Sequence, residues 1–186
     1  MQDNTPLPRH ILRVADLPQR KPTRISLRPE AQELAAIAAD LGLLGLRKLS
    51  FEAELAPAGK RDWRLTAKIG ATVIQPCVVT LEPVTTRIDE PVERLFMAEM
   101  PEIQDEEIEM AEDDNIDPLT SELDIAGIMI ESLALNLPLY PRAEGAEAVN
   151  MQVTEPGKAA MTDEDAKPFA GLAALKAKLN GGEGTH

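Results

Sequence analysis

Two stretches of alternating apolar and polar residues place the strongest limits on the fold of this chain. In residues 49–55, and again in residues 63–69, every second residue is apolar. Successive side chains of a strand point to opposite faces of a sheet, so each stretch predicts a strand with one buried face. The turn between them contains Pro57 and Gly59, which favours an antiparallel hairpin.

The two faces of this hairpin suggest its register. If Glu54 lies opposite Arg64, Leu55 lies opposite Trp63, and opposite charges share the solvent face. A slip by one residue would move the whole apolar set to solvent, so the apolar face fixes the register. We therefore expect Trp63 to lie in the core and not to serve as a platform for stacking nucleic-acid bases.

Residues before the hairpin indicate two short strands and a helix. Apolar residues in 12–17 and in 25–27 predict strands separated by a turn that contains prolines. Residues 30–41 are rich in Ala and Leu, with an apolar stripe at helical spacing. Pro29 suits the first turn of this helix, and Gly42 marks its end.

After the hairpin, the sequence remains typical of strands. Residues 72–81 continue the β-rich sequence, and residues 85–97 predict another strand. Proline cannot donate to the hydrogen-bond ladder of a sheet. We therefore expect an edge or a bulge at Pro76 and a break in the later strand at Pro91.

The last third of the chain predicts two helices separated by a linker. Asp124 is expected to cap a helix over about 125–137, which is apolar on most sides and therefore predicted to be buried. Residues 142–165 show no periodicity and predict a linker. Residues 166–180 predict a short amphipathic helix that would be marginal alone in water. The core domain is expected in residues 1–141.

The negative charge of the chain is concentrated in one stretch. The net charge is −13, and residues 99–124 contain twelve Asp or Glu and no Lys or Arg. A run of one sign repels itself and is costly to bury, so it predicts a mobile loop that attracts cations and repels phosphate. The carboxylates expected to bind a basic partner are Asp105, Glu106, Glu107, Glu109, Glu112, Asp113 and Asp114. A merely solvated loop is an equally good interpretation.

The first thirty residues have the opposite balance of charge. The basic residues there, which are candidates for contact with the phosphates of a nucleic acid, are Arg9, Arg13, Arg20, Lys21, Arg24 and Arg28. An ordinary solvated face explains these residues equally well. The two ends of the charge pattern suggest a module that contacts RNA on one side and a basic protein on the other.

The sequence predicts no enzyme, no cofactor and no metal site. It contains no phosphate loop, dinucleotide-binding glycine motif or nucleophile elbow, and its only histidines are His10 and His186. The acidic stretch lacks the glycine turn and the alternating ligands of a calcium loop. Cys77 is the only cysteine, and we interpret it as a small apolar residue on a strand.

Features of the whole chain predict a cytoplasmic protein. A single cysteine fits a reducing compartment. No stretch approaches eighteen apolar residues, and the polar N-terminus lacks the apolar segment of a secretion signal.

Three segments, in order, resemble the YceD-type family of large ribosomal RNA subunit accumulation proteins. They are CVVTLEP at 77–83, LALNLPLYPR at 133–142 and KPFAGLAALK at 167–176, with the acidic stretch between the first two. The resemblance extends from about Arg9 to Leu179. It implies a role in the accumulation or maturation of large-subunit ribosomal RNA, without a known catalytic activity.

The chain departs from the family at two positions that bear on metal binding. Many members carry a second cysteine three positions after the first, where this chain has Thr80. Some members place His or Cys just after the Leu-Pro segment, where this chain has residues 142–144. A metal site built from such additional ligands is therefore not expected here.

We predict an α+β fold, an antiparallel sheet packed with helices, with a long acidic loop and a C-terminal helix. The predicted function is that of a non-enzymatic ribosome biogenesis factor. Its expected partner is large-subunit ribosomal RNA or a pre-ribosomal particle, with a basic ribosomal protein as a further candidate. No membrane and no small-molecule substrate are expected.

Two alternatives come from other classes of protein. An acidic adaptor that binds a basic partner without RNA contact would need only the acidic loop and the C-terminal helix. A nuclease would need carboxylates that hold two divalent cations about 3.5–4 Å apart on rigid elements, which a self-repelling loop does not provide.

Overall fold

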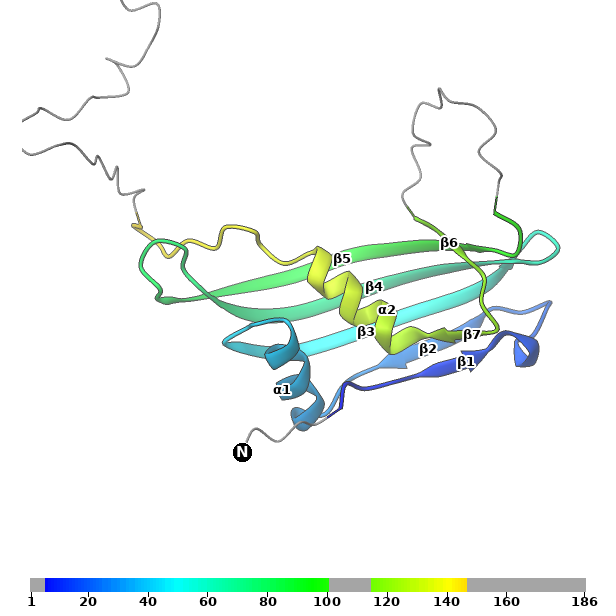
Figure 1. Ribbon diagram of the computed structural model, residues 1–186, viewed down its shortest axis with the longest axis horizontal. Helices are drawn as coiled ribbons and strands as arrows, with labels where there is room; N and C mark the ends of the chain where they lie inside the picture. Colours follow the sequence, from blue (N-terminus) through cyan, green and yellow to red (C-terminus); the bar gives the residue numbers. More distant parts are fainter. Residues whose placement is uncertain (1–5, 101–114, 147–186) are drawn as a thin grey trace, which may run out of the picture. The chain divides into compact units, whose positions relative to one another are not determined.

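The computed structural model describes residues 6–100 and 115–146 (Figure 1). The elements in these two ranges are β1 (Ile11–Arg13), the 3-10 helix η1 (Val14–Asp16), β2 (Thr23–Leu27), α1 (Ala31–Asp40), β3 (Gly45–Ala58), β4 (Asp62–Pro76), β5 (Pro83–Met97), β6 (Ile116–Pro118), β7 (Glu122–Asp124) and α2 (Ile125–Leu135). The fold is α+β, as the sequence predicted. The predicted C-terminal helix, most of the linker and the seven candidate acidic residues lie outside the described ranges.

The main sheet has five strands in the order β2-β3-β4-β5-β6, and β1 pairs with β7 in a separate two-stranded ribbon. The strands from β2 to β5 are antiparallel to their neighbours, whereas β6 runs parallel to β5. In Figure 1, α2 lies across β3, β4 and β5, beside the ribbon of β1 and β7. We call the face of the sheet that carries α2 the covered face and the opposite one the open face.

The core lies between the covered face and α2. Side chains from β3 and β4, such as Phe51 and Leu65, have no exposed surface, and the same holds for Ile125, Met129 and Leu133 of α2. Seven of the eleven residues of α2 are buried, as its composition predicted, whereas Gly127, Glu131, Ala134 and Leu135 form an exposed side. None of the described helices is long and apolar enough to cross a bilayer.

The hairpin of β3 and β4 has a different register from the one expected. Leu55 lies opposite Leu65, and Glu54 lies opposite Thr66, which shifts the partner of each residue by two positions. Gly59 adopts a positive φ of 78°, and the turn is centred one residue later than predicted. Because a two-residue shift preserves the alternation, the predicted buried face is still correct.

Strands β4 and β5 are both longer and more continuous than predicted. Strand β4 has 15 residues and ends at Pro76. Strand β5 also has 15 residues and passes through Pro91 without a break, so that expectation was wrong. β6 pairs with β5 only from Leu95 to Met97, so at Pro91 the outer edge of β5 has no partner among the described strands. A residue without an N–H fits such an edge.

Both helices begin with the caps that their sequences favour. Helix α1 has a capping box, in which the Glu30 N–H donates to Glu33 Oε2 at 2.7 Å. Pro29 therefore precedes the cap and is not in the first turn. At the start of α2, Asp124 Oδ1 accepts a hydrogen bond from the Gly127 N–H at 3.2 Å, as predicted.

Part of the acidic stretch is ordered, which corrects the expectation of a mobile loop across 99–124. Residues 116–118 and 122–124 are the strands β6 and β7. The described carboxylates pair with arginines from distant parts of the chain, in the pairs Arg61–Glu99, Arg94–Asp117, Arg13–Glu122 and Arg9–Asp124. These arginines offset the repulsion between neighbouring carboxylates of the acidic stretch. The sequence prediction counted only the charges within the stretch and so did not include them.

Candidate nucleic-acid interface

The open face of the sheet is polar and charged. The outward residues of neighbouring strands lie in rows, and three of these rows are Glu52–Lys68–Pro91, Ser50–Gly70–Asp89 and Arg47–Thr72–Arg87. Strand β2 adds Arg24 and Ser26 opposite Glu54 and Glu52. Within residues 6–100 and 115–146, no helix or ribbon packs on this face.

Most of the carboxylates on the open face are bonded to basic or hydroxyl groups. Arg28 Nη2 lies 3.2 Å from Glu52 Oε1, which also accepts the Ser26 hydroxyl at 2.9 Å. The Ser26 hydroxyl and then Arg28 hold the pKa of Glu52 below its usual range. Arg87 forms a two-bond pair with Asp89, at 2.6 and 2.7 Å, and lowers the pKa of that carboxyl.

Positive charge gathers at one end of the open face. A β-bulge interrupts β3 between Arg47 and Ser50, and Lys48 within it has a φ of +52°. Neither Arg47 nor Lys48 forms an ion pair with another described residue, and the same is true of Lys68. This end therefore carries more positive charge than its carboxylates neutralise.

A hollow of about 520 Å³ lies at this end, which we call the basic hollow. Its lining residues come from the end of β2 and from β3, β4 and β5, and they are Arg28, Lys48, Leu49, Ser50, Thr72 and Arg87. Leu49 is buried and supplies an apolar wall. The other lining groups are three cations and two hydroxyls, a combination suited to an anion with several oxygen atoms.

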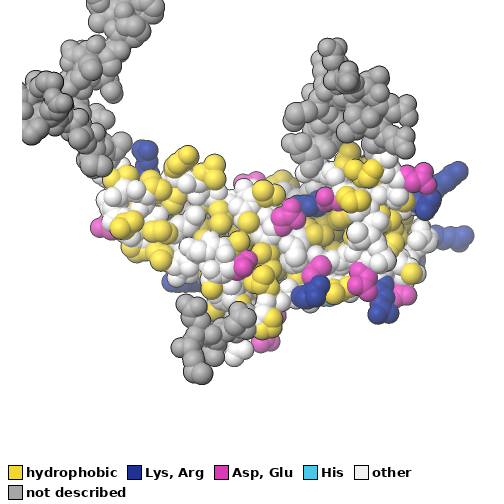
Figure 2. Space-filling model, in the orientation of Figure 1, with side chains coloured by type: hydrophobic (Ala, Val, Ile, Leu, Met, Phe, Trp, Pro, Cys, Tyr) yellow, Lys and Arg dark blue, Asp and Glu magenta, His cyan; other side chains and the backbone are white. Residues whose placement is uncertain are grey.

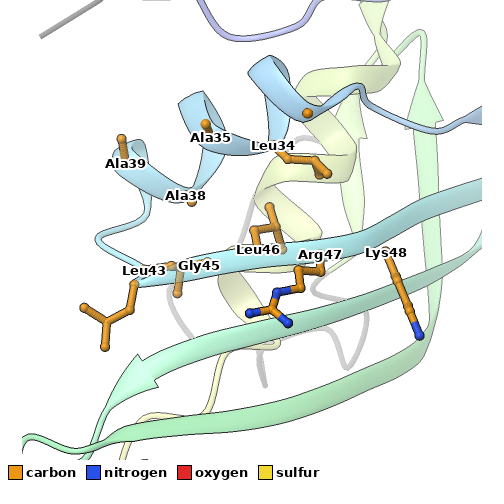
Figure 3. A pocket seen from close by; sticks show the side chains of 11 residues that line it. Leu34, Ala35, Ala38, Ala39, Leu43, Gly45, Leu46, Arg47 and Lys48 are labelled. Atoms are coloured by element: carbon orange, nitrogen blue, oxygen red, sulfur yellow. The ribbon is translucent and has the colours of Figure 1, made fainter.

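An apolar groove of about 580 Å³ lies beside the basic hollow, between α1 and the start of β3. In Figure 3, Leu34 of α1 and Leu46 of β3 lie in the space between the helix and the strand. Arg47 and Lys48 extend from β3 on the side away from α1. Lys48 lines both hollows, so the apolar groove and the basic hollow are adjacent.

The structure separates the six candidate basic residues of the N-terminal segment. Arg9 and Arg13 pair with carboxylates of β7, which together with β1 forms the ribbon beside α2. Arg24 and Arg28 belong to the open face. The remaining two, Arg20 and Lys21, are exposed in the turn before β2.

The sequence interpretation missed the basic residues of β3, β4 and β5. Lys68 and Arg87 lie within predicted strands but were not considered as binding residues, and Arg47 and Lys48 precede the strand predicted from residue 49. A signal for the bulge is nevertheless present, because the apolar residues Leu46 and Leu49 are three positions apart and break the two-residue period.

Cys77 lies in the turn between β4 and β5, not on a strand as expected. Its side chain is fully buried, and Sγ accepts N–H groups of Val79 and Thr80 at 3.4 Å and of Ala143 at 3.3 Å. The Thr80 side chain, followed by these backbone groups, lowers the pKa of the thiol to about 6. The description of Cys77 as a small apolar residue is therefore incomplete.

The same turn brings together the positions at which members of the family that the chain resembles were expected to carry further Cys or His residues. The Thr80 and Ala143 N–H groups both donate to the Cys77 sulfur. Across residues 6–100 and 115–146, no three His, Cys, Asp or Glu residues are grouped so that they can hold a metal ion. The absence of a metal remains a prediction for the whole chain.

Exposed apolar side chains surround this turn. Val78, Leu81, Leu139 and Tyr140 are all about half exposed or more, and the Val78 N–H donates to the Pro141 carbonyl at 2.9 Å. Hydrophobic side chains are prominent at this end of the molecule in Figure 2. We call these four residues the apolar patch; such patches favour contact with another protein.

A comparison with protein families gives one match. The family model described as large ribosomal RNA subunit accumulation protein YceD matches residues 65–176, which is more than half of the chain. The matched region includes most of β4, all of β5, the Cys77 turn and α2. No curated protein and no solved structure matches the chain.

Proposed function

This chain belongs to the YceD family of large ribosomal RNA subunit accumulation proteins, and from that premise we propose that it is a non-enzymatic factor that binds RNA through its open face. The RNA is large-subunit ribosomal RNA, free or in a pre-ribosomal particle, and the protein acts in the cytoplasm. Binding protects or positions this RNA during maturation, and its accumulation follows.

The excess of positive charge at one end of the open face carries this proposal. The chain as a whole has a net charge of −13. A surface on which Arg47, Lys48 and Lys68 form no ion pair with another described residue is therefore unusual for it. Contacts to phosphates supply most of the affinity of sequence-independent binding to nucleic acids.

The kind of contact follows from the absence of aromatic side chains on the described part of this face. Phe51, Trp63 and Phe96 are buried in the core, and Tyr140 lies in the apolar patch. Sheets that read single-stranded bases stack them on exposed aromatics. This face is instead suited to phosphates and 2′-hydroxyl groups, so we expect it to bind RNA with little sequence preference.

The arrangement of carboxylates supports a role without catalysis. On the open face, Glu52, Glu54 and Asp89 are each paired with an arginine. A metal-dependent nuclease needs carboxylates that are free to hold divalent cations. Magnesium-dependent cleavage of RNA by the purified protein would contradict this part of the proposal.

Cross-linking in cells tests the proposed function. The tagged full chain is cross-linked to RNA by ultraviolet light, and both the bound RNA and the cross-linked peptides are sequenced. We expect enrichment of large-subunit ribosomal RNA and cross-links within β3, β4 or β5. Normal large-subunit RNA levels in cells without the protein, together with no enriched RNA, would overturn it.

The apolar patch favours a second candidate, an adaptor that binds a protein partner without contacting RNA. Leu139→Ser with Tyr140→Ser should then abolish co-purification of the partner and reduce large-subunit RNA levels. For the same candidate, Asn/Gln at the seven acidic positions should slow association with a basic partner, less so at high salt. The adaptor would be excluded if neither the serine substitutions in the apolar patch nor the Asn/Gln substitutions changed partner binding or large-subunit RNA levels, and the protein still cross-linked to RNA.

A further inference from the structure

We infer that the basic hollow is a subsite for one phosphate group of an RNA backbone, an inference that rests on the proposed function. Arg28, Lys48 and Arg87 supply positive charge from three strand regions, and Ser50 and Thr72 supply hydroxyl donors. A phosphodiester has two anionic oxygens and two ester oxygens that such donors can reach from different sides.

The carboxylates next to the hollow are already engaged. Both oxygens of Asp89 accept hydrogen bonds from Arg87, and one oxygen of Glu52 accepts from both Ser26 and Arg28. Arg87 still has donors to spare, because its guanidinium carries five N–H groups. Its Nη1 is also within 3.5 Å of Thr72 Oγ1, which directs this group toward the hollow.

Gly70 gives the Arg87–Asp89 pair its position on the sheet. A Cβ atom at Gly70 would lie 2.7 Å from Arg87 Nη2, 3.0 Å from Asp89 Oδ1 and 3.2 Å from Ser50 Oγ. Any side chain at this position therefore displaces the guanidinium or the hydroxyl. The geometry of the hollow therefore depends on having glycine at position 70, and not only on the charges around it.

Lys48 occupies a backbone conformation that disfavours its side chain. Its φ of +52° lies in the left-handed region, where glycine is favoured. Bulges often occur where a side chain is redirected for binding, and strained residues persist where function needs them. Lys48 is one of the residues that line the hollow, and its side chain extends from β3 on the side away from α1 (Figure 3).

The surroundings of the hollow favour an RNA backbone over a free phosphate ion. Lys68 of β4 lies on the same open face, and Arg24 lies on β2, the strand beside β3. A polymer with regularly spaced phosphates can contact the hollow and these cations together, whereas an isolated phosphate cannot. Contact with several phosphates also makes the affinity steeply dependent on salt.

A matched pair of lysine substitutions tests the inference. Binding of a fluorescent, mixed-sequence single-stranded RNA to the purified full chain is measured by anisotropy between about 50 and 200 mM salt. Lys48→Gln should weaken binding about five- to tenfold at the lowest salt and reduce the salt slope by about 0.7. Lys60→Gln removes the same charge in the exposed β3–β4 turn and should change neither quantity.

A second variant separates the geometry of the hollow from its charge. Gly70→Ala leaves every charge in place but displaces the Arg87 guanidinium, which lies at the end of a flexible side chain and can move. We expect the protein to remain folded, as judged by circular dichroism, and to bind RNA more weakly than the unaltered protein. If the Gly70→Ala and Lys48→Gln proteins both bind RNA as tightly as the unaltered protein, the inference about the hollow is wrong. The proposed function would still stand, because the protein would still bind RNA.

Other ligands give distinct outcomes. Inorganic phosphate and an acidic peptide are each titrated into the isotope-labelled protein, and the amide signals of Gly70 and Thr72 are followed. Larger changes in these amide signals on addition of the RNA than on addition of phosphate or of the peptide support the inference. Saturation by phosphate or by the peptide without RNA binding would overturn both the inference and the proposed RNA contact.

Discussion

The two faces of the same sheet use neighbouring residues for different purposes. On the covered face, Leu55, Leu65 and Ile69 are fully buried against α2 and the other core elements. On the open face, Glu54, Thr66 and Lys68 lie one position away in the sequence and face outward. Residues that stabilise the fold and residues that can bind a partner are therefore interleaved along each strand, and single substitutions can separate the two roles.

The largest expected effect comes from placing the same charge on each face in turn. Leu65→Asp puts an unpaired carboxylate into the core and should cost more than about 4 kcal/mol, which unfolds the domain. Thr66→Asp should cost about 0.5–1 kcal/mol, because it faces solvent but lies in a row with Glu54 and Glu93. Urea denaturation measures both, and equal losses would contradict the assignment of faces.

Arg94 is a charged residue on the covered face, so it sharpens the comparison. Its side chain is only 15% exposed and pairs with Asp117 at 2.9 Å and Glu131 of α2 at 2.8 Å. Arg94→Ala should destabilise the protein by about 1–3 kcal/mol, because both carboxylates lose their partner. Arg64→Ala, on the open face, should change stability by less than about 0.5 kcal/mol. Similar thermal unfolding of the two variants would show that the Arg94 network contributes little.

At the bulge, stability and binding should change in opposite directions. Lys48→Gly relieves a left-handed lysine and should stabilise the protein by about 0.5–1 kcal/mol, while it weakens RNA binding. Lys68→Gly, at a regular strand position, should lower stability by about 0.5–1 kcal/mol. Denaturation and anisotropy on both variants check this. A Lys48→Gly protein that is less stable would mean that the bulge is not strained.

The smallest expected effect concerns Cys77, which lies at the end of the sheet and belongs to neither face. The hydrogen bonds from Thr80 and the neighbouring backbone lower its pKa to about 6, so the thiolate is favoured in the folded state. The contribution of the thiolate to the free energy of unfolding is fully present above about pH 8.5, the pKa of cysteine in the unfolded chain, and is lost as the pH falls toward 6. Ultraviolet absorbance of the thiolate should show a midpoint near 6.

Two variants provide controls for this titration. Thr80→Val should raise the midpoint of the thiolate titration, because it removes the Thr80 hydroxyl, which contributes most to the lowered pKa of Cys77. Cys77→Ser should leave large-subunit RNA levels unchanged and lower stability modestly. Loss of bound zinc in the Cys77→Ser protein would contradict the prediction that no metal is present.

Local signals were sufficient for the elements whose boundaries depend on neighbouring residues. The alternation in β3 and β4 predicted both strands and the buried face, and Asp124 and Gly42 marked a helix start and a helix end correctly. The register failed because Pro57 and Gly59 allow turns centred on different residues. The observed pairing of β3 with β4 distinguishes them.

The candidate site was less accessible to sequence reasoning. The N-terminal basic residues were identified by their density in the sequence, but pairing with Asp124 and Glu122 places Arg9 and Arg13 away from the open face. The basic hollow combines Arg28, Lys48 and Arg87, which are separated by up to about sixty residues along the chain. Proximity of this kind comes from strand pairing, and it leaves no local pattern.

The sequence by itself determined which residues of β3 and β4 face the core, where α2 begins and which family the chain resembles. These properties follow from periodicities and caps that act over a few residues. The tertiary structure alone decided which charges are paired, because an ion pair depends on distance in space. It joined the carboxylates of β6 and β7 to distant arginines and left Arg47, Lys48 and Lys68 without partners among the described residues, on an open face that a net charge of −13 did not foretell.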